Sequence, residues 1–127
     1  MNPAFLTLDE VLEIHQDQLG RYGGSAGIRD LGLLQSALAQ PKATFGRQFL
    51  HADLFEMAAA YLFHIVQNHP FIDGNKRVGA VASIVFLNLN DHDIKATNDE
   101  LEALVLSVAR GKADQATIVE FFRDRAV

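Results

Sequence analysis

Residues Asp53–Leu89 read DLFEMAAAYLFHIVQNHPFIDGNKRVGAVASIVFLNL, which is two long apolar segments on either side of a short polar one. The apolar segments, from Ala52 or Asp53 to Gln67 and from Asn75 to Leu89, carry hydrophobic residues on nearly every helical face. A helix that is apolar on all sides is buried at the centre of a domain, because none of its faces favours water. We therefore predict two central helices joined by the polar segment.

The rest of the chain is predicted to supply outer helices. Hydrophobic residues recur there with helical spacing, and no long alternation of β-branched residues predicts a sheet. Thr7 and Thr97 each open a Thr-x-x-Glu pattern, which is the spacing of a helix-capping box. The predicted outer helices are 8–19 with Gly20 as a candidate end, 31–40 before Pro41, 98–110 and 115–125. Only residues 42–50 favour a turn or short hairpin, so the expected class is all-α, with about six helices.

Composition limits the kinds of protein this chain can be. Its 127 residues, 49% hydrophobic and 21% charged, fit one domain. Eleven basic and sixteen acidic residues give a net charge of −5, which repels a phosphate backbone and argues against direct binding of nucleic acid. The longest segment without Asp, Glu, Lys or Arg, 57–72, is too short and too polar to span a membrane. The N-terminus has no signal-peptide pattern, so a cytoplasmic location is expected.

The polar segment between the central helices has the features of an anion site. Pro70 disfavours helical backbone at His69, and Asp73 or Gly74 is placed to cap the following helix. The N-terminus of that helix presents free N–H groups and the positive end of its dipole, and Lys76 and Arg77 add two charges there. The segment therefore predicts a phosphate site in an otherwise acidic chain.

Two further side chains of this segment suit chemistry on a phosphate. Asp73 is a hard oxygen ligand of the kind that holds Mg²⁺ against nucleotide phosphates. His69 lies four residues earlier, and histidine suits a general base at neutral pH. Phe71, between them, is expected to anchor the loop in the core. By contrast, residues 22–27, YGGSAG, lack the spacing of a dinucleotide-binding loop and are interpreted as a plain connector.

Residues 69–77, HPFIDGNKR, match the signature His-Pro-Phe-x-Asp-Gly-Asn-x-Arg of the Fic/Doc family at every fixed position. Outside this motif loop the chain resembles the short death-on-curing branch of that family, over most of residues 8–110. The resemblance rests on Ile14-His15, Arg21–Gly24, Gly27–Asp30, Leu34–Leu38 and Phe86–Asn88. It implies a single Fic-type domain over 1–127, with a β-hairpin flap at about 42–50 that docks the backbone of a target protein.

The resemblance also implies a role for each residue of the motif. His69 would deprotonate a hydroxyl of the target, Asp73 would hold Mg²⁺, and the nucleotide would be ATP. The anion hole would be formed by Gly74 and Asn75, and the phosphates would be bound by Lys76 and Arg77. Controlling partners would come from outside the chain, as a cognate antitoxin.

The chain departs from the adenylylating members of the family at two positions. Lys76 replaces a glycine, and Ala80 replaces a second arginine that clamps phosphate. Both changes are those of the death-on-curing branch, which is associated with phosphorylation of a translation elongation factor, such as elongation factor Tu, and arrest of translation. Phosphoryl transfer is therefore the favoured reaction. Adenylyl transfer, and a catalytically idle module that binds the factor or an antitoxin, remain as alternatives.

Overall fold

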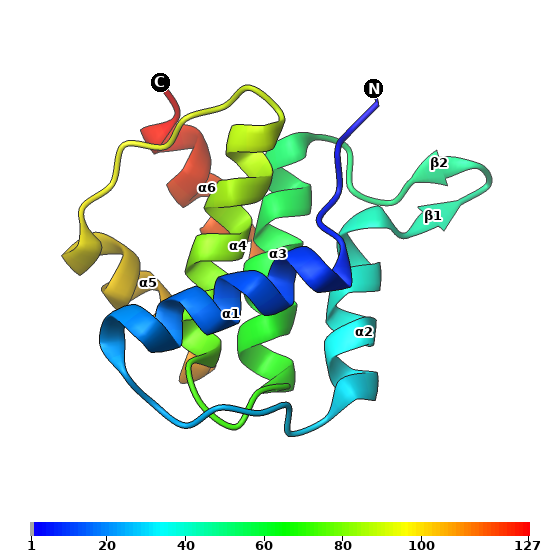
Figure 1. Ribbon diagram of the computed structural model, residues 1–127. Coiled ribbons are helices and arrows are strands. Elements are labelled where there is room, and N and C mark those ends of the chain that lie inside the picture. The colour runs from blue at the N-terminus through cyan, green and yellow to red at the C-terminus, as the bar shows by residue number, and fades with distance from the viewer. Residues whose placement is uncertain (1) are drawn as a thin grey trace.

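The computed structural model describes residues 2–127, and within this range the chain forms six α-helices and one short hairpin (Figure 1). The expected all-α class is therefore confirmed. The order of elements is α1 (Leu8–Tyr22), α2 (Leu31–Ala39), the 3-10 helix η1 (Gln40–Lys42), β1 (Thr44–Phe45), β2 (Gln48–Phe49), α3 (Leu54–Asn68), α4 (Asn75–Leu89), α5 (Asn98–Ala109) and α6 (Gln115–Arg125).

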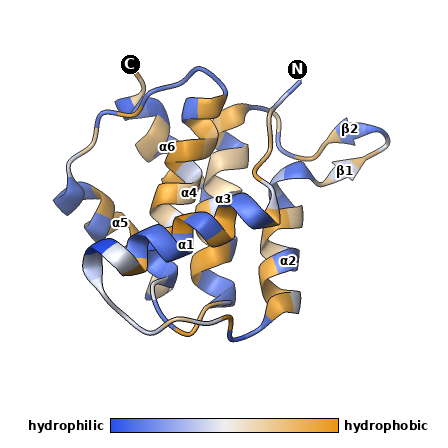
Figure 2. Cartoon of the chain, viewed as in Figure 1, coloured by the Kyte–Doolittle hydropathy of each residue, from blue (hydrophilic) through white to orange (hydrophobic). Residues whose placement is uncertain are grey.

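Helices α3 and α4 form the centre of the molecule, as the apolar segments predict. Each contributes eight buried residues, and hydrophobic residues make up much of both helices (Figure 2). Gly79 allows the two helices to approach closely, because a Cβ there would lie 2.9 Å from Cγ2 of Val66 and 3.3 Å from the carbonyl oxygen of Leu62. The other helices pack around this pair, with α1 crossing both of them (Figure 1).

The helix ends follow local signals with one exception. Both predicted capping boxes are present, at Thr7 and at Thr97. The first helix does not end at Gly20 but runs to Tyr22, with Gly23 as its C-cap. Gly23 adopts φ 78° and its N–H donates to the carbonyl of Leu19 at 2.8 Å. The end of the helix is set by this glycine with its positive φ, whereas Gly20 stays inside the helix with open space where its side chain would be.

The predicted hairpin is confirmed at residues 44–49. Its strands pair Thr44 with Phe49 and Phe45 with Gln48, and Gly46 and Arg47 form the turn with φ 59° and 67°. Positive φ at both turn residues suits the right-handed twist of a tight hairpin. The hairpin follows α2 and precedes α3, so it projects from the N-terminal end of α3 (Figure 1). The motif loop lies at the other end of this 15-residue helix, about 22 Å away along its axis.

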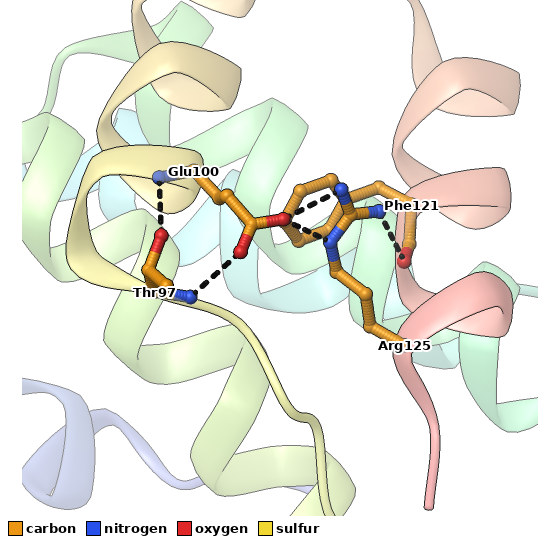
Figure 3. A network of polar contacts seen from close by, with 4 residues as sticks. All are labelled: Thr97, Glu100, Phe121 and Arg125. Carbon is orange, nitrogen blue, oxygen red and sulfur yellow. Dashed lines mark hydrogen bonds and ion pairs between the residues drawn. The ribbon is translucent and has the colours of Figure 1, made fainter.

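A polar network joins the start of α5 to the end of α6 (Figure 3). Glu100 closes the capping box with Thr97 and also pairs with Arg125, whose Nη2 lies 2.7 Å from Oε2 of Glu100. The guanidinium of Arg125 in turn lies 3.9 Å from the ring centroid of Phe121. These contacts hold the N-terminal turn of α5 against the C-terminal end of α6. In the part of the chain that the structure describes, no helix has the length and apolar character needed to cross a membrane.

Candidate functional site

The loop between α3 and α4 begins and ends on left-handed residues. His69 is the C-cap of α3 with φ 50° and ψ 53°, and Gly74 is the N-cap of α4 with φ 84°. Pro70 follows His69, and a residue before proline disfavours right-handed helical backbone, which explains where α3 ends. Of the two predicted caps for α4 the structure selects Gly74, with no side-chain cap.

The side chain of Asn75 holds this loop closed. Its Oδ1 accepts the N–H of Phe71 at 2.9 Å, and its Nδ2 donates to the carbonyl of Phe71 at 3.0 Å. Asn75 is only 4% exposed, and the Phe71 ring is fully buried, as predicted. Because Oδ1 and Nδ2 of the amide both bind Phe71, this side chain is engaged in the loop, and the backbone N–H of Asn75 is a further donor at the start of α4.

His15 supports the same loop from α1. Its ring stacks on Phe71 with centroids 3.9 Å apart, and its Nε2 donates to the carbonyl of Asp73 at 2.9 Å. A carbonyl oxygen only accepts, so Nε2 carries the proton in this arrangement. The predicted apolar face of the first helix thus includes one polar side chain that fixes the backbone beside Asp73.

Residues 23–30 run alongside the motif loop, so the segment 22–27 is more than the plain connector that the sequence suggested. Ile28 pairs with Phe71 as an isolated antiparallel bridge. The N–H of Arg29 donates to Pro70 at 2.7 Å, and the N–H of Ile72 donates to Gly27 at 3.1 Å. Both segments lie at the same end of the bundle (Figure 1). Sequence periodicity could not detect this pairing, since it joins backbone groups more than forty residues apart.

Asp73 is an exposed carboxylate held by two backbone donors. Ser25 N–H lies 3.1 Å from Oδ2 and Gly74 N–H lies 2.9 Å from Oδ1, and these bonds hold the pKa of the Asp73 carboxyl below its usual value. The charges of Arg77 and Lys76 act in the same direction. Gly24 suits this position because its φ is 120°, which L residues rarely adopt, and because a Cβ there would lie 2.7 Å from Oδ2 of Asp73.

The donor set of Asp73 fits a shared magnesium ion. Each carboxylate oxygen accepts one N–H and keeps a further lone pair for a cation. Magnesium is commonly bound by one or two carboxylates together with nucleotide phosphates and water. Over residues 2–127, no group of three or more His, Cys, Asp or Glu side chains is arranged to hold a metal ion.

A pocket of about 520 Å³ opens beside the motif loop. All six residues predicted for the site contribute to its lining: His69, Asp73, Gly74, Asn75, Lys76 and Arg77. The opposite wall comes from α5, through apolar residues such as Leu101 and Val105 and the polar Asn98 and Glu102. The sequence does not predict this wall, because α5 is more than twenty residues from the motif and its residues resemble an ordinary amphipathic helix.

The N-terminus of α4 presents donors and positive charge to this pocket. The N–H of Val78 is the first to bond within the helix, to Gly74 at 2.9 Å, so the three preceding N–H groups lack an intrahelical acceptor. Lys76 is exposed. Arg77 is half-buried, with its guanidinium 5.3 Å from the ring centroid of Tyr22 and 3.4 Å from the carbonyl of Gly23. This arrangement suits phosphate groups.

Known proteins resemble this chain in sequence. The chain is 36% identical over 99 residues to "Toxin Doc" of Mycolicibacterium smegmatis, a match that covers 76% of each chain. It is 28% identical over 115 residues to "Protein kinase doc" of Escherichia phage P1, covering 91% of this chain and 90% of the relative. The model of the Fic/DOC family matches residues 5–87, which include the whole motif loop. On this evidence the chain belongs to the Fic/DOC family, and its relatives are of the Doc type.

Proposed function

We propose that this chain is a Doc-like toxin that transfers the γ-phosphoryl group of ATP to a hydroxyl group of a target protein. The observation that carries the proposal is the single pocket that contains both His69 and the N-terminus of α4. A histidine beside free helix N–H groups and two cationic side chains is the arrangement that such a transfer needs. The names of the relatives, a toxin and a protein kinase, support a protein-modifying transferase.

In the proposed reaction, His69 takes the proton from the target hydroxyl. The oxygen of that hydroxyl then forms a bond to the γ-phosphorus while the bond from the γ-phosphorus to the β–γ bridging oxygen breaks, and ADP leaves. The N–H groups at the start of α4, with Lys76 and Arg77, stabilise the charge on the phosphoryl oxygens. Asp73 would hold Mg²⁺, which supplies further neutralisation of phosphate charge when bound.

Two residues favour phosphoryl over adenylyl transfer. Lys76 adds bulk and charge at the start of α4, close to where a transferring phosphoryl group would sit. Ala80 also lines the pocket, and its methyl group cannot clamp a leaving pyrophosphate as an arginine would. We therefore expect the γ-phosphate, rather than the α-phosphate, to lie beside His69.

The biological setting completes the proposal. The protein substrate is a translation elongation factor such as elongation factor Tu, and its modification would arrest translation in the cytoplasm. A cognate antitoxin would cover the pocket or the docking surface for the substrate. The assignment of residues 42–50 as a flap that docks the substrate stays a prediction, and within residues 2–127 the hairpin contributes nothing to the lining of the pocket.

In the decisive experiment, the purified protein is incubated with a bacterial extract and with ATP that is labelled either at the α-phosphate or at the γ-phosphate. Phosphoryl transfer labels a protein only from γ-labelled ATP, and His69→Ala should abolish the label. Lys76→Ala should weaken it, whereas Lys112→Ala, an exposed lysine outside the pocket, should leave it unchanged. A label from α-labelled ATP would replace the kinase assignment with adenylyl transfer. A folded protein that neither binds Mg·ATP nor labels any protein would identify an idle binding module.

A further inference from the structure

We propose that Arg29 is a positioning residue for His69, because its guanidinium binds the two successive carbonyl groups that define the backbone conformation of His69. Arg29 Nε donates to the carbonyl of His69 at 2.6 Å, and Nη2 donates to the carbonyl of Asn68 at 2.9 Å. The backbone N–H of Arg29 binds the next carbonyl, that of Pro70, at 2.7 Å. The proposal rests on the proposed role of His69 as the general base.

The geometry explains why these bonds act on His69 in particular. The φ and ψ angles of a residue describe how the peptide plane before it is rotated relative to the plane after it. The carbonyl of Asn68 belongs to the first of these planes and the carbonyl of His69 to the second. A rigid planar group that holds both carbonyls therefore fixes φ and ψ of His69 at 50° and 53°.

His69 needs such support because its conformation is unfavourable. A left-handed backbone brings Cβ close to the following carbonyl oxygen, and helices that end this way usually place glycine at the left-handed position. The last carbonyl groups of α3 also lack intrahelical donors, and a cation at this end of the helix interacts favourably with its dipole. Arg29 meets both needs, and so the chain can carry a histidine where glycine is the usual residue.

Lysine would not replace Arg29. The guanidinium presents several N–H donors in a fixed plane, whereas an ammonium group is a single point charge on a flexible stem. Arg29 is also absent from the residues that line the pocket in the described part of the chain. Replacing Arg29 should therefore alter the orientation of the His69 side chain while leaving the binding of ATP nearly intact.

The test compares Arg29→Lys and Arg29→Ala with the matched control Arg123→Lys. Arg123 pairs with Asp53 at the opposite end of the same helix α3. The first measurement is kcat and KM for ATP in phosphoryl transfer, with and without added methylguanidinium. The second is the ¹³Cα and ¹³Cβ chemical shifts of His69, which report its backbone conformation without any need for activity.

For both Arg29 variants we expect kcat to fall about 10- to 100-fold, since a displacement of about 1 Å at a catalytic group can cost about 100-fold. The KM for ATP should stay within about two-fold of the wild-type value. Methylguanidinium should restore part of kcat in Arg29→Ala, and the His69 shifts should move away from left-handed values. The control should change neither kcat nor the shifts.

Two results would overturn the proposal. One is that the His69 chemical shifts stay unchanged in Arg29→Ala. The other is that the Arg29 variants raise only the KM for ATP and leave kcat at the wild-type value. Should Arg29→Ala not fold, Arg29→Lys decides by the same two measurements. A wild-type protein that transfers nothing from ATP would overturn the proposed function, while the shifts would still decide whether Arg29 sets the conformation of His69.

Discussion

Replacing Asn75 by alanine separates two roles for this residue, as a phosphate ligand and as a clamp of the motif loop. In the structure the Asn75 amide binds both the N–H and the carbonyl of Phe71, at 2.9 and 3.0 Å. Phe71 is fully buried and Asn75 is only 4% exposed, so water has little access to the two groups that the amide binds. The substitution therefore leaves one donor and one acceptor of Phe71 without a partner.

The expected cost follows from these two groups. A buried polar group that loses its partner costs about 1–3 kcal/mol. Two such groups, less a few tenths gained from the better helix propensity of alanine, give a loss of about 3 kcal/mol in the free energy of unfolding. The free energy of unfolding of a small domain is about 5–15 kcal/mol in total, so the substitution would remove a large fraction of the stability. The midpoint of thermal unfolding should fall by about 10 °C.

Urea denaturation followed by circular dichroism measures the change. Asn98→Ala is the matched control, because Asn98 is exposed and should change stability by no more than about 0.5 kcal/mol. Asn75→Asp should be at least as harmful at neutral pH, since an oxygen would then face the carbonyl of Phe71. If Asn75→Ala lost less than about 1 kcal/mol, the two bonds to Phe71 would not hold the loop, and the clamp would be refuted.

Three other predictions address single groups. The free energy of unfolding should be about 1 kcal/mol larger for His69→Gly than for His69→Ala, because only glycine adopts φ 50° without strain, and equal urea midpoints would contradict this. Both variants should slow transfer by about 10²- to 10⁴-fold. Asp73→Asn should weaken ATP binding in the presence of Mg²⁺ but not in EDTA, and titration calorimetry that shows the same loss in both would remove the metal role. Burial raises the pKa of Tyr61 to about 12, so the unfolded chain releases this proton from about pH 10 while the folded chain keeps it. The free energy of unfolding should therefore fall by about 2–3 kcal/mol between pH 10 and pH 12. This loss should persist in Tyr22→Phe and be absent from Tyr61→Phe.

The helices were predictable because their signals are local. Helix α4 spans Asn75–Leu89 as predicted, since an apolar run and a preceding glycine mark its bounds without reference to other elements. The capping boxes at Thr7 and Thr97 join residues three apart, which the sequence displays directly. Gly20 misled the prediction for α1, because which of two nearby glycines ends a helix depends on the backbone path that follows.

The amino-acid sequence alone determined the helical class, the two buried central helices and the presence of a charged loop between them. Only the tertiary structure decided that the Asn75 side chain turns inward to Phe71, that Arg29 caps the end of α3, and that α5 forms the far wall of the pocket. The reason is physical: helix periodicity and capping depend on neighbours a few residues apart. The site instead depends on hydrogen bonds and packing between segments up to 58 residues apart, as between His15 and Asp73, and no local pattern records such contacts.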